Sequence, residues 1–149
     1  MDFVAVNSTP GYWTFTSSGY GVGKAAIAER SIVGIADTGT TLLMLPTSVV
    51  QTYYDAVRGA QDESSAGGWI FPCSATLPDF LFVVGATVIT IPGEYMNYAP
   101  ADAAGNWCYG GLQDSTHLGL NIFGDVALKA AFVLFDGSTP SLGWATKNL

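Results

Sequence analysis

The sequence is poor in charged residues, and above all in positive ones. Only five of its 149 residues are Lys or Arg, against twelve Asp or Glu. Nucleic-acid phosphates are bound by clustered Lys and Arg, whereas these five cations (Lys24, Arg30, Arg58, Lys129 and Lys147) are scattered. The composition therefore argues against a nucleic-acid partner. So few cations also keep self-repulsion small when carboxylates protonate, which suits an acidic environment.

Long apolar runs and metal-binding patterns are missing as well. No apolar stretch approaches the roughly 20 residues of a membrane-spanning helix, so no membrane association is expected, and Met1-Asp2-Phe3 does not open a signal peptide. One histidine, His117, and two cysteines without a Cys-x-x-Cys spacing predict no metal site and no cofactor. Cys73 and Cys108 allow a single disulfide. Together with the N-glycosylation sequon that begins at Asn7, they favour a secreted protein.

Apolar residues, by contrast, are abundant. They make up 49% of the chain, enough for one domain over residues 1–149 with a core of its own. Short β-prone runs separated by Gly, Ser and Pro predict a mainly β fold. The expected strands are 2–7, 12–16, 24–30, 31–36, 42–45, 69–71, 80–84, 87–91, 107–112, 118–123, 131–135 and 142–145, with 85–86 as a hairpin turn.

One main helix is expected, with one or two short helical turns. Pro46 suits a first helical turn, the apolar residues from Val49 to Val57 share one face, and Gly59 ends the helix after Arg58. A short turn is expected at 125–129, with Asp125 as its cap. Residues 61–68 are polar and rich in Gly and Ser, which predicts a surface loop.

One loop has a composition suited to catalysis. Asp37-Thr38-Gly39-Thr40-Thr41 separates two apolar runs, so the sequence predicts a strand, a tight polar loop and a second strand. Gly39 permits close approach of its backbone N–H to a carboxylate oxygen, and Thr40 adds a hydroxyl that can hold the other side of the group. Asp-Thr-Gly also occurs in ordinary turns, but the apolar flanks favour a functional site. His117 is interpreted as a loop residue.

These flanks resemble a known family. Ile35 to Leu43 closely matches the catalytic loop in the C-terminal lobe of fungal pepsin-like aspartic endopeptidases of the endothiapepsin-like group. Residues 71–78, Phe-Pro-Cys-Ser-Ala-Thr-Leu-Pro, are similar to the same lobe's disulfide segment, and residues 121–133 to its terminal stretch. The resemblance runs in order from about Val4 to Ala145. It implies a single lobe of the pepsin-like acid protease fold.

The resemblance also implies residue roles. Asp37 matches the catalytic aspartate, Thr38 a threonine that hydrogen-bonds across the lobe boundary, and Gly39 and Thr40 the groups that bond the carboxylate. Residues at substrate-binding positions are Thr41, Met44, Leu118, Leu120 and Ile122; Met44 stands where an aromatic residue is common, and Leu118 and Leu120 where Ile is common. Cys73 and Cys108 match the lobe's disulfide pair.

The family's chemistry requires two aspartates, and this sequence contains one Asp-Thr-Gly loop. The resemblance implies acid-pH peptide hydrolysis by an assembly in which this lobe supplies one aspartate, with a peptide substrate or a pepstatin-like inhibitor as ligand. The partner is then the N-terminal lobe of the same enzyme, and the lobe alone is expected to be inactive. A homodimer similar to retroviral proteases, with Asp37 from each of two copies, is an alternative. A non-catalytic β-rich binding or folding module is another.

Overall fold

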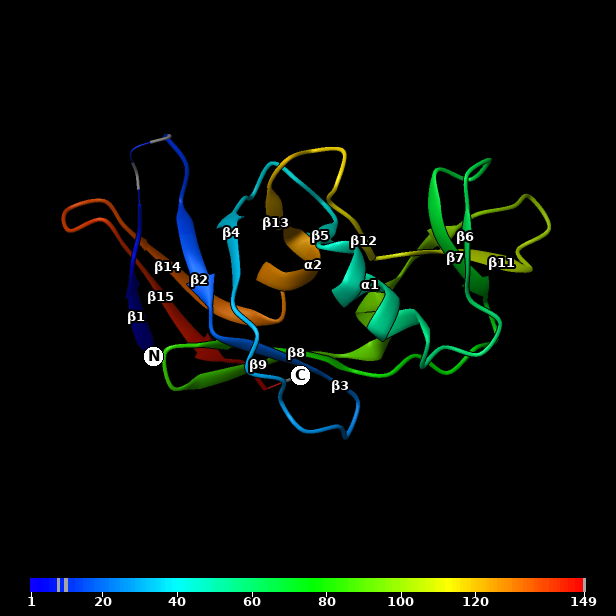
Figure 1. The fold of residues 1–149 in the computed structure, drawn as a ribbon, viewed down its shortest axis with the longest axis horizontal. Coiled ribbons are helices and arrows are strands. Elements are labelled where there is room, and N and C mark those ends of the chain that lie inside the picture. Colours follow the sequence, from blue (N-terminus) through cyan, green and yellow to red (C-terminus); the bar gives the residue numbers. More distant parts are fainter. Residues whose placement is uncertain (8, 10, 149) are drawn as a thin grey trace.

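The computed structural model describes residues 1–7, 9 and 11–148 and is mainly β (Figure 1). Four sheets surround one hydrophobic core, and the helices are short. The predicted mainly β lobe with one principal helix is therefore confirmed. The sequon beginning at Asn7 includes Ser8, which lies outside the described residues.

The central sheet positions the Asp37 loop. Its five strands lie in the order β12 (Leu112–Asp114), β5 (Leu43–Leu45), β13 (Asn121–Phe123), β4 (Ile32–Ala36) and β2 (Thr14–Ser17). β13 lies between β4 and β5, parallel to the first and antiparallel to the second. The two apolar runs on either side of the Asp37 loop are therefore not direct neighbours, because a strand from late in the chain separates them.

Three smaller sheets complete the fold. β1 (Asp2–Ala5), β15 (Ser141–Thr146) and β14 (Ala131–Asp136) form one, which lies at one end of the molecule in Figure 1. At the opposite end lie β10 (Asn97–Pro100), β11 (Trp107–Gly110), β7 (Gly68–Pro72) and β6 (Gln61–Glu63). The third contains β3 (Gly19–Val22), β8 (Phe80–Val84) and β9 (Thr87–Ile91). The predicted β8–β9 hairpin is confirmed, and Gly85 in its turn has a φ of 60°, which favours glycine.

The helices differ from prediction mainly at their ends. α1 spans Thr47–Tyr54, with Pro46 as the N-cap and not in the first turn. After Tyr54 the chain forms single turns and not further helix, so α1 ends before Arg58. One of these turns is closed by the hydrogen bond from the Val57 amide to the Tyr54 carbonyl. α2 spans Asp125–Leu128, so the prediction of Asp125 as its cap is wrong: Gly124 holds the N-cap position and Asp125 is the first helical residue. A 3-10 turn, η1, spans Gly93–Met96.

Several strand predictions were wrong as well. Residues 24–30 contain no strand, only an isolated bridge from Ala28 to Tyr20, and the paired strand is β3 instead. The predicted loop at 61–68 begins with β6, and β10 was not predicted. The strand expected at 118–123 is reduced to β13, because residues 116–119 form a turn in which Gly119 has a φ of 71°.

Aromatic side chains dominate the core beneath the central sheet. Phe15 lies 4.8 Å from Phe123 and 5.2 Å from Trp144 between ring centroids. Tyr53 and Tyr54 of α1 are buried too, and their hydroxyls donate to the carbonyls of Pro78 and Leu112. Burial raises the pKa of both phenols above the ordinary range. α1 is thereby fixed by polar as well as apolar contacts.

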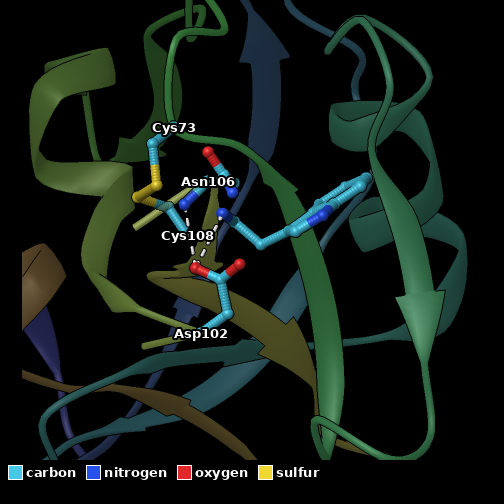
Figure 2. The surroundings of a disulfide bond; sticks show 5 residues. Cys73, Asp102, Asn106 and Cys108 are labelled. Carbon is cyan, nitrogen blue, oxygen red and sulfur yellow. Dashed lines mark hydrogen bonds between the residues drawn. A yellow bond between two sulfur atoms is a disulfide. The ribbon is translucent and has the colours of Figure 1, made fainter. Parts of the chain in front are cut away.

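The predicted disulfide is present. Cys73 and Cys108 are bonded with Cα atoms 5.0 Å apart (Figure 2). Asp102 lies beside them, where its Oδ1 accepts the amide N–H groups of Asn106 and Trp107 at 2.8 and 3.2 Å. The bond joins the end of β7 to β11, so it reinforces a pairing that the backbone already makes.

Candidate active site

Asp37 is the first residue after β4, and its own loop holds its carboxylate in place. The Gly39 amide donates to Oδ1 at 2.9 Å, and the Thr40 hydroxyl donates to Oδ2 at 2.6 Å. One donor for each oxygen fixes the plane of the carboxylate and leaves its other lone pairs free to accept. A side chain at position 39 would place its Cβ 3.2 Å from Oδ1, so glycine leaves room for the close approach of this backbone.

The segment after β13 supports the loop from behind. The Asp125 amide donates to the Thr40 carbonyl at 2.8 Å, and the Val126 amide to the Thr41 carbonyl at 3.0 Å. A Cβ on Gly124 would collide with the carbonyl oxygens of Thr40 and Leu42. The glycine is therefore required for close contact between this segment and the loop. The start of α2 thus supplies the backbone donors that fix the loop.

One row of residues runs across the central sheet on the face that carries Asp37. Strand pairing aligns it as Gln113, Met44, Ile122, Ile35 and Thr14. Side chains alternate between the faces of a strand, so Asp37 lies on the same face as Ile35, two positions further along. The neighbours Leu43 and Phe123 point to the opposite face and are fully buried in the core. The row therefore defines the floor beside the candidate catalytic group.

One end of this floor opens into an apolar pocket of about 400 Å³. Its lining residues are Tyr12, Thr14, Val33, Gly34, Ile35, Gly119, Leu120 and Asn121. Leu120 thus lines a pocket, and Ile122 lies on the floor beside it. Leu118 lies in the 116–119 turn with 48% of its surface exposed and does not line this pocket.

The other end opens into a larger pocket of about 520 Å³, called here the acidic pocket. It is lined by Leu42, Met44, Thr47, Asp62, Ser64, Gly67, Gly68, Trp69, Tyr109, Gln113, Asp114, Thr116 and His117. Met44 therefore lines a pocket, whereas Thr38 and Thr41 are exposed residues of the Asp37 loop. The candidate catalytic carboxylate thus lies on a sheet face with a pocket at each end.

Asp114 is the most constrained carboxylate of the acidic pocket. Its Oδ1 accepts the Thr116 amide N–H at 2.7 Å, and the Thr116 hydroxyl lies 2.9 Å from that of Thr47. Burial raises the pKa of Asp114, but hydrogen bonds from Thr116 and Thr47 and the positive field of His117 outweigh it and lower the pKa below the ordinary value. The carboxylate therefore stays ionised further into the acid range than a free aspartate.

Most lining residues were not identified from the sequence. Tyr12 and Val33 precede the Asp37 loop, while Trp69, Tyr109 and Gln113 come more than 30 positions after Asp37. They reach the site through strand order and register. The one available signal was the two-residue period of a strand, which places Val33 and Ile35 on the same face as Asp37 once β4 is identified.

Two features are absent from the described part of the chain. No group of three or more His, Cys, Asp or Glu side chains is placed to hold a metal ion. No helix there is long and apolar enough to cross a membrane.

Comparison with known proteins places this geometry in context. Residues 1–147 match the family described as eukaryotic aspartyl protease. The chain is 54% identical over 148 residues to endothiapepsin of Cryphonectria parasitica, and 53% identical over 150 residues to podosporapepsin of Podospora anserina. It is 47% identical over 145 residues to penicillopepsin-3 of Penicillium janthinellum. These alignments cover 97–100% of this chain but 35–37% of the relatives, so the chain spans about a third of their length.

Proposed function

Since the chain belongs to the eukaryotic aspartyl protease family, we propose that it forms one half of an aspartic endopeptidase that hydrolyses peptide bonds at acid pH. The observation that carries the proposal is the Asp37 carboxylate, held by Gly39 and Thr40 on a sheet face between two pockets. Asp37 is one of the two catalytic carboxylates. Its partner carboxylate comes from a second lobe.

The chemistry requires two carboxyl groups in different protonation states. One takes a proton from the attacking water while the other gives one to the carbonyl oxygen of the scissile bond. In aspartic proteases, as is well established, two neighbouring carboxyls share a proton because both cannot ionise at such short range. The role of Asp37 is to hold or release that shared proton. Its two loop donors keep the carboxylate plane fixed throughout.

The remaining site residues support binding. Gly39 and Thr40 orient the carboxylate, and Thr38, exposed beside Asp37, bonds to the partner lobe. The substrate lies along the floor of the site, in contact with Thr41, Met44, Leu120 and Ile122, and Leu118 contacts it from the exposed turn. A pepstatin-like inhibitor occupies the same face.

The length of the relatives supports a second lobe as partner, because about two thirds of each relative lies outside the matched region. Since residues 35–43 resemble the catalytic loop of a C-terminal lobe, that partner is the N-terminal lobe. The Cys73–Cys108 bond supports a secreted protein, since disulfides persist in oxidising compartments.

The test compares the chain alone with the same chain fused to the N-terminal lobe of endothiapepsin. Peptide cleavage at pH 3–5, with and without pepstatin, is measured over a dilution series. We expect pepstatin-sensitive cleavage by the fusion and none by the chain alone. Cleavage by the chain alone with a rate rising as the square of concentration would support the homodimer instead. A folded fusion that binds pepstatin without cleaving would support a binding module.

A further inference from the structure

The acidic pocket differs from the apolar pocket in the charge of its walls. It contains two carboxylates, Asp62 and Asp114, and its residues include no Lys or Arg. The apolar pocket contains no ionisable carboxylate. A substrate that crosses the floor from one pocket to the other therefore meets two different environments.

The walls of the acidic pocket are rigid and aromatic. The Trp69 ring stacks on Tyr54 with centroids 4.7 Å apart and an interplanar angle of 4°. The Tyr109 hydroxyl donates to the Gly67 carbonyl at 2.8 Å. Gln113 bonds the Trp69 backbone in both directions, as acceptor at 2.8 Å and donor at 3.0 Å. These contacts fix the shape of the pocket before any ligand enters, which lowers the entropic cost of binding.

We propose that the acidic pocket binds a lysine or arginine side chain of the peptide substrate, with its aliphatic stem against the aromatic walls and its cationic head facing the carboxylates. The inference rests on the proposed function, because it takes a peptide on the floor of the site as ligand. A volume of about 520 Å³ accommodates either side chain. Long basic side chains pack their methylene groups on apolar surface while the head stays at a polar site.

His117 is the one basic residue among those that line the pocket. Protonated, it offsets one of the two carboxylates and leaves a net negative charge. Neutral, it leaves both uncompensated. The preference for a basic side chain is therefore expected whether or not His117 carries a charge.

The experiment measures binding, so it does not depend on catalysis. N-acetyl-lysine methylamide and its uncharged isostere N-acetyl-norleucine methylamide are titrated into the isotope-labelled chain at pH 4.5 and 7, and amide and indole resonances are followed by NMR. We expect about threefold tighter binding of the lysine ligand, the size typical of a solvent-accessible charge pair, with shifts centred on Trp69 and Gln113.

Three variants test the electrostatic origin of the preference. Asp114→Asn keeps an oxygen that can accept the Thr116 amide but loses the charge, and should bring the ratio of the two dissociation constants towards one. His117→Ala should raise it. Asp55→Asn removes the same charge from an exposed site on the end of α1, outside the pocket, and should leave it unchanged.

Equal binding of the two ligands would overturn the inference, and so would shifts centred on the apolar pocket. A lysine preference that is the same in Asp114→Asn and in the unaltered chain would also overturn it. Failure of the pocket proposal can be told apart from failure of the proposed function. An endothiapepsin fusion that cleaves peptides without this preference contradicts the pocket alone. If the chain binds the lysine ligand more tightly than the norleucine ligand but every fusion is inactive, only the proposed catalytic role is contradicted.

Discussion

The amide of Asp125 donates to the carbonyl of Thr40 at 2.8 Å, so the residue that holds the Asp37 carboxylate is itself held by the start of α2. This contact requires the absence of a side chain at position 124, where a Cβ would collide with the Thr40 carbonyl.

Gly124→Ala should therefore damage the loop. We expect a loss of about 1–3 kcal/mol in the free energy of unfolding, the usual cost of an extra carbon in a packed site, together with lower activity in the two-lobe fusion. Denaturant unfolding and peptide cleavage measure the two effects. Gly137→Ala is the matched control, because no atom lies within 4 Å of its added Cβ. Equal unfolding midpoints for the two variants would contradict the role given to Gly124.

Asp37→Asn should abolish activity while preserving the fold. The amide oxygen can face the Gly39 N–H, and the amide nitrogen can donate to the Thr40 hydroxyl, which rotates to accept. The amide cannot exchange the catalytic proton, so cleavage by the fusion should fall by at least about 10²-fold. Wild-type cleavage rates in this variant would show that Asp37 is not catalytic.

Thr38→Ala should weaken lobe association without destabilising this chain. Thr38 is exposed in the loop beside Asp37, where its hydroxyl is free to reach a partner lobe. Affinity between separately expressed lobes, measured by calorimetry, should fall several-fold, as expected for one lost hydrogen bond. An unchanged affinity would show that the Thr38 hydroxyl makes no stabilising contact with the partner lobe.

Removal of the disulfide should cost much of the stability. The bond closes a loop of 35 residues, for which the chain-entropy relation gives about 4 kcal/mol. The double variant Cys73→Ser/Cys108→Ser should show this loss in denaturant unfolding. Asp102 should still accept its two amide bonds, so the native strand register should survive at low temperature. Stability equal to that of the oxidised chain would contradict the expectation.

Stability should decline in strong acid. Oδ2 of Asp2 accepts the Thr87 hydroxyl and the Ala86 amide, which ties β1 to the β8–β9 turn. The Thr87 hydrogen bond is the main contribution that lowers the pKa of Asp2. A lowered folded-state pKa stabilises the fold above the unfolded pKa, and that stability is lost as pH falls through the folded value. Unfolding at pH 5.5 and pH 2.5 should differ less in Asp2→Asn than in the unaltered chain.

Local chemistry made part of this structure predictable. The Asp37 loop lies between two apolar runs, α1 follows a proline, and the β8–β9 hairpin turns at a glycine, so each could be identified from a few consecutive residues. β6 escaped prediction because Gln61-Asp62-Glu63 is polar and gains its strand form from pairing with β7. Residues 24–30 had a suitable composition but no partner beyond one bridge.

The pockets could not be predicted, for a different reason. Their residues meet because β13 inserts between β4 and β5, and no pattern within β13 itself specifies these two neighbours. Gln113 and Thr14 are at opposite ends of one row, although the sequence offers no sign that they share a face.

The insertion of β13 also has a consequence for the order of folding. The Asn121 side chain bonds the Val33 carbonyl across 88 positions of sequence, and the support for the Asp37 loop comes from the same late segment. Contacts so distant along the chain form slowly, because a long loop must close first. During synthesis Asp37 therefore lacks the support of β13 and the segment after it until most of the lobe has been made. The site is therefore assembled near the end of folding, when the lobe is almost complete.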